Sequence, residues 1–297
     1  MIKILILGGD GMIGHQLFLQ LKLKYNTMTT LKLSEKSYAK YNLYNKGNSF
    51  FNIDVTNFDS LKLCVELYQP NFIVNAIGIT KQRITGNNHD LVIKINSIFP
   101  HELGKLCEKM NIKLFQLSTD CVFSGLKGNY TEKDKPDCKD LYGQSKLNGE
   151  IINNRNVITI RKSTIGFECN KAHGLLEWFF SQTGEIYGYK NAFFTGITTI
   201  ELSKVIEAII KNYSDIHSLW NIGGDSISKF DLLNKIRELS NKNDINILED
   251  NIFLCDRSLD SSKFINYTNY NMPSWSEMLQ NLSNDYSFKK IKIKNNV

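Results

Sequence analysis

The sequence predicts an α/β fold: a doubly wound, parallel sheet of the Rossmann type, followed by a smaller C-terminal lobe. Three observations support this. Short apolar segments alternate with helix-length amphipathic segments through the first half of the chain, a glycine-rich turn directly follows the first apolar segment, and the alternation loosens after Arg161. Strands that are apolar on both faces and separated by helices are typical of a parallel sheet covered on both sides.

The first half supplies the elements of this sheet in order. The expected strands are Lys3–Leu7, Thr27–Leu33, Ser49–Ile53, Phe72–Ala76, Lys113–Leu117 and Val157–Arg161. The expected helices are Met12–Leu23, Phe58–Tyr68, His89–Met110 and Tyr142–Asn153. Because parallel crossovers are right-handed, this order favours helices on both faces of one sheet.

The glycine turn lies between the first strand and the first helix. Its spacing is Gly8-x-x-Gly11-x-x-Gly14. Gly8 permits a tight turn, Gly11 lets the backbone approach a pyrophosphate, and Gly14 allows close packing of the helix. The free N–H groups at the helix start, around Met12 and Ile13, suit phosphates. We interpret the turn as a dinucleotide site, and the alternative is a turn with a structural role only.

The end of the second strand indicates which dinucleotide is preferred. Sites for NAD place an acidic residue there to bind the ribose 2′-hydroxyl. This chain has none and carries Lys32 close by. A cation suits a 2′-phosphate, so NADPH is the expected cofactor and NADH the possible substitute; alternatively, Lys32 is an ordinary exposed lysine. Asp54 and Val55 are expected to contact the adenine, unless Asp54 is the N-cap of the next helix.

The second half of the chain is expected to form the smaller lobe. It carries predicted helices at Leu175–Ser181, Ile200–Lys211 and Lys229–Ser240, a strand at Leu219–Ile222, and a last helix after Pro273 and Trp275. We therefore assign residues 1–162 to an NADP-binding domain and residues 163–297 mainly to a substrate-binding lobe. Segments near 195–225 are expected to return to the first domain.

Composition excludes several classes of protein. The 297 residues are 42% hydrophobic and 22% charged, which is ordinary for a globular protein and unlike a disordered chain. No apolar run is long enough for a membrane span or a signal peptide, and no Cys/His spacing suggests a metal site. The net charge of +6 suits an anionic ligand but is too diffuse to indicate nucleic acid. A cytoplasmic protein without metal is expected.

A catalytic pattern follows in the second quarter of the sequence. Tyr142 and Lys146 are four residues apart and would share one face of a helix. A nearby ammonium lowers the pKa of a phenol, and Tyr142 can then give a proton to a carbonyl oxygen as hydride arrives. Lys146 can also hold the nicotinamide ribose. Ser118-Thr119-Asp120 ends a predicted strand, so Thr119 can offer a hydroxyl to the same carbonyl.

Several motifs together resemble one family. They are the glycine turn, Asn75-Ala76-Ile77-Gly78, Asn96, Ser118–Gly125 and Tyr142-x-x-x-Lys146. The chain resembles the extended short-chain dehydrogenases/reductases, and over Ser118–Glu150 it is similar to their dTDP-4-dehydrorhamnose reductase group. A weaker likeness continues through Ile227-Ser228-Lys229-Phe230 and Arg257-Ser258-Leu259-Asp260 to Pro273-x-Trp275.

The resemblance implies reduction of the C4 ketone of a nucleotide-linked 4-keto-6-deoxyhexose, for deoxysugars of surface glycans. The nucleotide is UDP, dTDP or GDP, and we favour a UDP-linked 2-acetamido-2,6-dideoxy sugar because residues 169–192 differ from the rhamnose-pathway reductases. Thr119 and Tyr142 would bind the keto oxygen, with Asp120 and Asn96 in support. Asn75, Ala76 and Gly78 would line the cofactor. The implied substrate-binding residues are Thr119, Asp120, Cys121, Tyr142 and Arg257.

One departure from the reductase pattern leaves a second activity open. Cys121 stands where that group commonly has tyrosine, and no glutamate follows Asp120 as in sugar-nucleotide dehydratases. GDP-fucose synthases have a cysteine at this spacing and a histidine further on, near the place of His173, and use them for epimerisation at C3 or C5. The alternative is that Cys121 is a packing residue and His173 a surface residue.

A third possibility belongs to another class: a non-catalytic NADP-binding regulatory subunit, like the reductase-like partner of methionine adenosyltransferase. The complete set of Thr119, Tyr142 and Lys146 argues against it. The expected partner is a nucleotide-sugar substrate, with homodimer formation possible and neither nucleic acid nor membrane expected.

Overall fold

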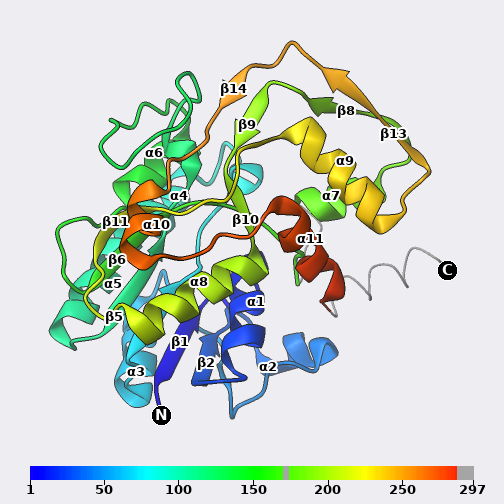
Figure 1. Ribbon diagram of the computed structural model, residues 1–297. Coiled ribbons are helices and arrows are strands. Elements are labelled where there is room, and N and C mark those ends of the chain that lie inside the picture. Colours follow the sequence, from blue (N-terminus) through cyan, green and yellow to red (C-terminus); the bar gives the residue numbers. More distant parts are fainter. Residues whose placement is uncertain (170–173, 286–297) are drawn as a thin grey trace.

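A single seven-stranded parallel sheet forms the centre of the molecule. The computed structural model describes residues 1–169 and 174–285 (Figure 1). The strand order is β11-β6-β5-β4-β1-β2-β3. The strands are β1 Lys3–Leu7, β2 Asn26–Thr30, β3 Ser49–Phe50, β4 Phe72–Asn75, β5 Lys113–Leu117, β6 Val157–Arg161 and β11 Ser218–Asn221. The order reverses between β1 and β4, which confirms the doubly wound Rossmann-type fold.

Helices cover both faces of this sheet. Ile4 and Ile6 of β1 belong to the core cluster that includes side chains of α1 (Met12–Leu21) and α8 (Thr199–Asn212). Leu5 and Leu7 face the other way, into the cluster formed with α3 (Phe58–Tyr68) and α5 (Phe99–Lys109). The apolar residues on both sides of β1 are therefore explained by burial of each face under a helix layer.

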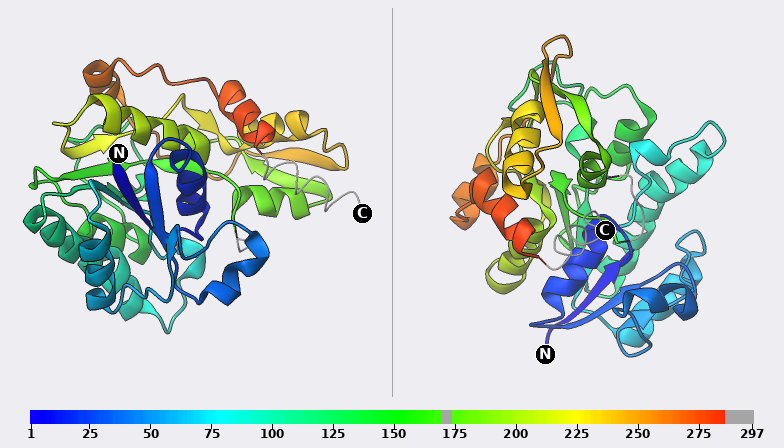
Figure 2. Two further views of the ribbon diagram at one scale, coloured as in Figure 1. Left: turned by 90° about the horizontal axis from the view of Figure 1, so that it is seen from below. Right: turned by 90° about the vertical axis from the view of Figure 1, so that its right-hand side faces the viewer.

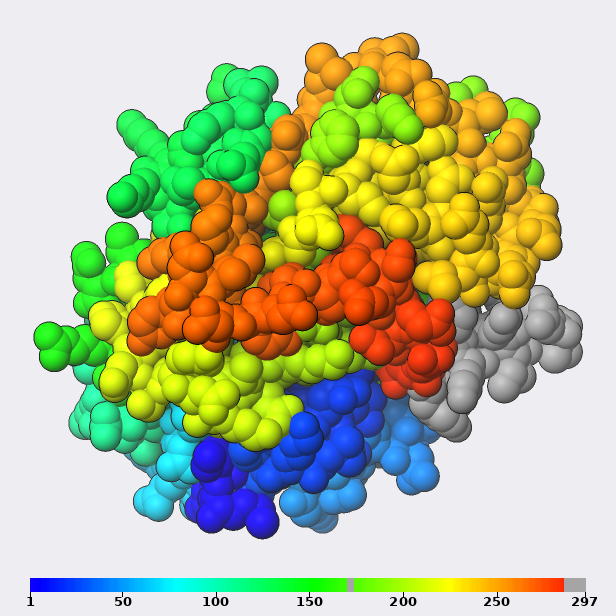
Figure 3. Space-filling model, viewed as in Figure 1, coloured from blue at the N-terminus to red at the C-terminus, as the bar shows by residue number. Residues whose placement is uncertain are grey.

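The later segments form a lobe beside the carboxyl ends of the strands (Figures 1 and 2). In Figure 3 these segments, yellow to red, cover the upper part of the visible face. Its strands are β8 Gly184–Tyr189 paired with β13 Ile245–Asp250, and β9 Ala192–Phe194 between β12 Ile227–Ser228 and β14 Cys255–Asp256. Its helices are α7 Leu175–Ser181, α9 Lys229–Ser240 and α11 Trp275–Asn284, whereas α10 Ser262–Thr268 packs against β11 at the edge of the central sheet. A short pair, β7 Ser163–Ile165 with β10 Gly196–Thr198, leads into α8.

Some expected boundaries are wrong. The helix expected at His89–Met110 is α4 (His89–Ile93), a π-helical turn (Lys94–Ile98) and α5. Within that turn, the Asn96 side chain bonds Ile79 and Ser145. The helix expected to reach Asn153 is α6, Leu141–Asn148. Gly149 is its C-cap and packs closely on the π turn: a Cβ on Gly149 would lie 2.0 Å from the Asn96 carbonyl oxygen.

Other elements are shorter than expected or were missed. The second and third strands end at Thr30 and Phe50 rather than Leu33 and Ile53, and α1 ends at Leu21 rather than Leu23. The short helix α2 (Glu35–Tyr38) and the lobe strands β7, β8, β9, β10, β12, β13 and β14 were not expected. Most of these strands are only two or three residues long, too short for an alternating pattern to be read.

A buried ion pair joins β5, β6 and the end of α6. The Arg161 Nε and Nη2 atoms donate to the two Glu150 carboxylate oxygens at 2.8 and 2.7 Å. The Ser118 hydroxyl donates to Glu150 Oε1 at 2.6 Å. The two charged side chains are only 3% and 5% exposed, and the guanidinium lies over the Phe123 ring. The Arg161–Glu150 pair can be buried because each charge neutralises the other. If one partner is removed, the remaining charge is buried without a counter-charge, which is strongly destabilising.

We expect Arg161→Met to lower the free energy of unfolding by about 3–5 kcal/mol, because it leaves the Glu150 carboxylate buried and unpaired. Urea denaturation measures this. The control is Lys62→Met, which removes an exposed ion pair to Glu66 and should cost less than about 0.5 kcal/mol. Equal losses for both variants would contradict the structural role of Arg161.

Candidate functional site

The glycine turn has the geometry of a phosphate site. Gly8 has φ +78°, a conformation that disfavours side chains, and its carbonyl accepts from the Gly11 N–H at 3.1 Å. A Cβ on Gly14 would lie 2.0 Å from the Gly8 oxygen, so only glycine lets α1 approach the turn this closely. Gly11 is the N-cap of α1 and leaves its first N–H groups, near Met12 and Ile13, without a side-chain cap. Such groups suit a phosphate.

Two tyrosines that the sequence did not identify as site residues form hydrogen bonds to this turn. The Tyr44 hydroxyl donates to the Gly9 carbonyl at 2.6 Å, and the Tyr38 hydroxyl donates to Asp10 Oδ2 at 2.9 Å. Burial, followed by the negative charge of neighbouring groups, raises the pKa of both phenols, so they stay protonated as donors. No motif marks them: Tyr38 ends the short helix α2, and Tyr44 lies in the irregular segment before β3.

Lys32 and Asp54, both expected at the adenosine end of the cofactor, contact each other. Their charged atoms are 3.0 Å apart and both side chains are largely exposed. Burial acts to raise the pKa of Asp54, but hydrogen bonds from Thr56 and Lys32 outweigh it and hold the pKa below its usual value. The N-cap of α3 is Asn57, so the alternative reading of Asp54 as that N-cap is wrong. Val55 is buried in the core beneath them.

The segment after β4 is tied to its surroundings by two buried asparagines. Asn75 donates to Gln116 at 2.8 Å and accepts from the Ile77 N–H, which fixes the path through Ala76 towards Gly78. Asn96 accepts from the Ile79 N–H at 2.9 Å and donates to the Ser145 hydroxyl at 3.0 Å. The segment expected to line the cofactor is thereby held against α6.

The expected catalytic residues converge at the carboxyl end of β5. Lys146 on α6 donates to the Leu117 carbonyl at 2.6 Å and is 7% exposed. Thr119 follows two residues later, and its hydroxyl contacts Asp120 Oδ1 at 3.0 Å. A Cβ on Gly78 would lie 3.8 Å from the Lys146 ammonium, so the segment after β4 borders the same site.

The expected lowering of the Tyr142 pKa by Lys146 is wrong for this structure, because burial of the phenol outweighs it. Burial, then the neighbouring Cys121 and Asp120, raise the pKa of Tyr142, while a hydrogen bond from Thr119 acts in the opposite direction. Burial and the positive charge of Lys162 lower the pKa of Lys146 to about 8, which Glu150 opposes. At neutral pH the phenol therefore carries its proton and the amine is largely charged.

Cys121 is placed beside Arg257 of the lobe. The Arg257 Nη1 atom is 3.8 Å from the Cys121 sulfur, and its Nε donates to the Phe123 carbonyl at 2.9 Å. Burial and the Asp120 charge raise the pKa of Cys121 to about 12, against the effect of Arg257. The thiol is therefore protonated at neutral pH. His173 lies outside the described residues.

Two further cations lie at this site and were missed. Lys162, the residue after β6, is 9% exposed and faces Asp120 and Cys121. Lys229 starts α9, faces the same pair, and lies over the Phe194 ring at 3.3 Å from its centroid. The only sequence signal for Lys162 is its place directly after a parallel strand, where ligands bind in open α/β sheets.

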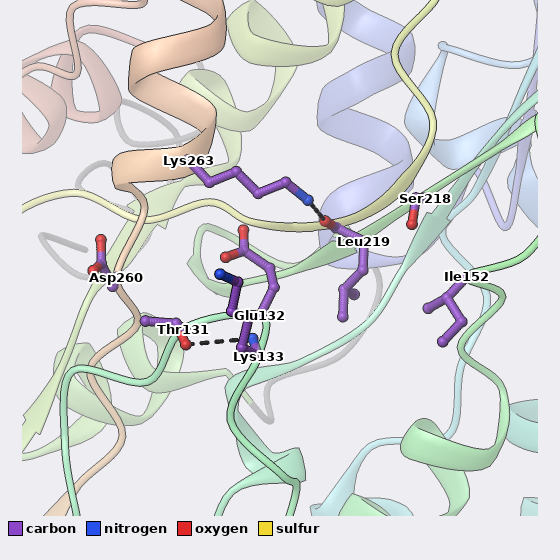
Figure 4. Close-up of a pocket in the computed structure, with 8 residues that line it drawn as sticks. All are labelled: Thr131, Glu132, Lys133, Ile152, Ser218, Leu219, Asp260 and Lys263. Atoms are coloured by element: carbon purple, nitrogen blue, oxygen red, sulfur yellow. Dashed lines mark hydrogen bonds between the residues drawn. The ribbon is translucent and has the colours of Figure 1, made fainter.

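A pocket of about 540 Å³ lies at the free edge of β11, apart from these residues (Figure 4). Its walls are Thr131, Glu132, Lys133, Ile152, Ser218, Leu219, Asp260 and Lys263. Glu132 accepts from the Asn221 N–H at 2.8 Å and Lys263 donates to the Leu219 carbonyl at 2.7 Å. These side chains bond the open edge of the strand, and none is a predicted site residue.

The part of the chain that the structure describes contains neither a membrane-spanning helix nor a metal-binding cluster. None of its helices is both long and apolar enough to cross a bilayer. Residues 1–169 and 174–285 also contain no group of His, Cys, Asp or Glu side chains arranged to hold a metal ion.

The fold and the site define an extended short-chain dehydrogenase/reductase: a doubly wound sheet, a glycine turn at its switch point, and a Thr/Tyr/Lys set at the end of β5. Within that class, residues 2–171 match the RmlD substrate binding domain family, and the chain belongs to it.

Known proteins similar to this chain have several roles. A probable low-salt glycan biosynthesis reductase, Agl14 of Haloferax volcanii, is 27% identical over 40% of this chain and 41% of its own. Methionine adenosyltransferase 2 subunit beta of Danio rerio is 26% identical over 50% and 42%. The structure of dTDP-4-dehydrorhamnose reductase of Bacillus anthracis in complex with NADP aligns at TM-score 0.75, with 20% identity, over 94% of this chain and 98% of that one. The matches to the two curated relatives span about two fifths of their lengths.

We expect Cys121 to resist alkylation. With a pKa of about 12 instead of 9.0, its thiolate fraction at pH 8 is about a thousandfold below that of an unfolded thiol. Iodoacetamide labelling followed by peptide mass spectrometry measures the rate, with the urea-unfolded protein as the reference. Labelling at the unfolded rate would contradict the raised pKa of this thiol.

Proposed function

We propose that this protein reduces the C4 ketone of a nucleotide-linked 4-keto-6-deoxyhexose with NADPH. The observation that carries the proposal is the convergence of Thr119, Tyr142 and Lys146 beside Gly78 and the cofactor turn. The nucleotide is UDP or dTDP, and we favour a 2-acetamido-2,6-dideoxy sugar. Membership of the RmlD family supports the substrate class.

In this proposal a bound nicotinamide dinucleotide supplies hydride to the C4 carbon. Thr119 donates a hydrogen bond to the keto oxygen and orients it towards Tyr142. As the C=O π electrons move to oxygen, the Tyr142 hydroxyl gives its proton to that oxygen, leaving an alcohol and a phenolate. The Lys146 ammonium stabilises the phenolate until water restores the proton.

The cofactor residues fit a dinucleotide. The uncapped start of α1 would bind the pyrophosphate, Asn75, Ala76 and Gly78 would line the nicotinamide side, and Lys146 would hold the ribose. Lys32 reaches the 2′-phosphate when it turns from Asp54, and it thereby favours NADPH over NADH. Asp120 and Arg257 contact the sugar, with Cys121 packed between them.

Tyr142→Phe is expected to lower turnover by about 10²–10⁴ while NADPH still binds, because the ring remains and the proton donor is lost. Assays with UDP- and dTDP-linked 4-keto-6-deoxy sugars, together with cofactor titration, measure both effects. Tyr267→Phe, a half-exposed tyrosine of α10, is the control and should behave as wild type. Normal turnover by Tyr142→Phe would overturn the proton-donor role.

Lys32→Ala is expected to weaken NADPH binding several-fold and leave NADH nearly unaffected, because an exposed charge contact contributes about 1 kcal/mol. Isothermal titration of both cofactors tests this. Lys36→Ala, in the neighbouring helix α2, is the matched control. If the unmodified protein binds both cofactors equally, Lys32 does not select the 2′-phosphate.

An epimerase activity before reduction is the second candidate, and the contact between Arg257 and Cys121 is what favours it. A C4 ketone acidifies the protons on C3 and C5, and a thiolate beside Arg257 could remove one. The raised pKa of Cys121 opposes this. The epimerase hypothesis predicts exchange of one ring proton for deuterium in D₂O with NADP⁺, lost in Cys121→Ser. If mass spectrometry finds no deuterium in the recovered substrate, the epimerase hypothesis is wrong and Cys121 is a packing residue.

A regulatory subunit is the third candidate, favoured by the likeness to methionine adenosyltransferase 2 subunit beta. The complete proton-transfer set argues for catalysis, since a binding module does not need it. NADPH oxidation that depends on a 4-keto sugar nucleotide is expected of the reductase and not of a regulatory subunit.

A further inference from the structure

Two stacked aromatic side chains lie between the end of β5 and the lobe. The Phe123 and Tyr130 rings are 0% and 3% exposed, and they stack with their centroids 4.0 Å apart and an angle of 7° between their planes. The Arg161 guanidinium also lies over the Phe123 ring, 5.1 Å from its centroid. The Phe123 N–H donates to the Asp120 carbonyl at 3.0 Å. Both the ring and the backbone of Phe123 are therefore fixed relative to the end of β5.

Each of the two aromatic residues binds one part of the lobe segment that carries Arg257. The Phe123 carbonyl accepts from the Arg257 Nε atom at 2.9 Å. The Tyr130 N–H donates to the Ser258 carbonyl, and the Tyr130 carbonyl accepts from the Asp260 N–H, both at 2.8 Å. Phe123 therefore holds the side chain of Arg257, and Tyr130 holds the backbone that follows it.

These contacts leave part of the Arg257 guanidinium available to a ligand. Its Nη1 atom lies 3.8 Å from the Cys121 sulfur, and its Nη2 atom forms no hydrogen bond or ion pair with any residue in 1–169 or 174–285. A guanidinium binds phosphate and other oxygen ligands through a rigid, planar fork of N–H groups. Because the fork is rigid, fixing its Nε atom on Phe123 also fixes the direction of the remaining donors.

We propose that Phe123 and Tyr130 are positioning residues whose stacked rings hold the Arg257 guanidinium where it binds the sugar nucleotide. The stack fixes the Phe123 carbonyl, and that carbonyl fixes the guanidinium. A pair that served only to fill the core would not influence substrate binding. The hold on the guanidinium is independent of the activity, whereas its effect on the substrate rests on the proposed function.

The direct test follows the Arg257 Nε–H group by NMR in protein labelled with ¹⁵N-arginine. The chain has five arginines, and Arg257→Lys identifies the signal of interest by its loss. A hydrogen-bonded N–H in a stable part of the structure exchanges slowly with water. Tyr130→Leu removes the stacked ring and should speed this exchange several-fold, which is about the contribution of one aromatic pair. Tyr130→Phe keeps the ring and should leave the exchange rate unchanged.

The matched control is Tyr68→Leu. Tyr68 of α3 is also a buried tyrosine that packs against a phenylalanine, Phe50, but it has no contact with Arg257. This variant should lower stability without changing the exchange at Arg257. Tyr130→Met serves if Tyr130→Leu does not fold. Unchanged exchange in the folded Tyr130 variant, or the same acceleration in Tyr68→Leu, overturns the proposal.

Steady-state kinetics give a second readout. Tyr130→Leu should raise KM for the sugar nucleotide several-fold, and this rise should exceed any change in kcat. Arg257→Lys should raise the same KM. The double variant should have a KM no higher than that of Arg257→Lys alone, because the stack acts through this guanidinium.

The two readouts distinguish failure of this proposal from failure of the proposed function. Additive increases of KM in an active enzyme contradict the positioning role of the stack. A protein that reduces none of the 4-keto sugars contradicts the proposed function, and the exchange rates of the Arg257 Nε–H group then still decide whether the stack holds the guanidinium.

Discussion

The Glu150 carboxylate is the constraint on which the candidate site depends. It is buried and accepts hydrogen bonds from Ser118 at the end of β5 and from Arg161 at the end of β6. Glu150 itself lies two residues after α6, the helix of Tyr142 and Lys146. One ion pair therefore links two strand ends to the helix that carries Tyr142 and Lys146. Because water cannot replace these bonds, the elements keep one arrangement.

Positive charge is the common property of the residues around Asp120. Lys162, Lys229 and Arg257 all face Asp120, and Lys146 binds the Leu117 carbonyl at the end of β5. The surplus suits anionic ligands such as a dinucleotide and a nucleotide sugar. Burial, assisted by the positive charge of Lys162, lowers the pKa of Lys146 to about 8, whereas burial and the Asp120 charge raise the pKa of Cys121.

The sequence predicts the sheet well, because its strands and its glycine turn depend on local pattern. The bounds of β1, β5 and β6 follow from apolar runs, and the glycine turn follows from spacing. The π-helical turn could not be predicted, since it depends on bonds between Asn96 and distant residues. The strand β8 could not be predicted either, because it pairs with β13, a strand about sixty residues later in the sequence, with Ile245 opposite Gly184. Lys162 could not be predicted as a site residue, because it belongs to no motif and its neighbours Asp120 and Cys121 are distant in the sequence.

The most direct test of the account is transfer of a labelled hydride. The protein is incubated with NADPH deuterated at the transferred position of the nicotinamide and with a UDP- or dTDP-linked 4-keto-6-deoxy sugar, and the recovered sugar is analysed by NMR and mass spectrometry. The account predicts one deuterium on C4 of the product alcohol. Cofactor binding without deuterium in any of these sugars would contradict it and favour a binding role.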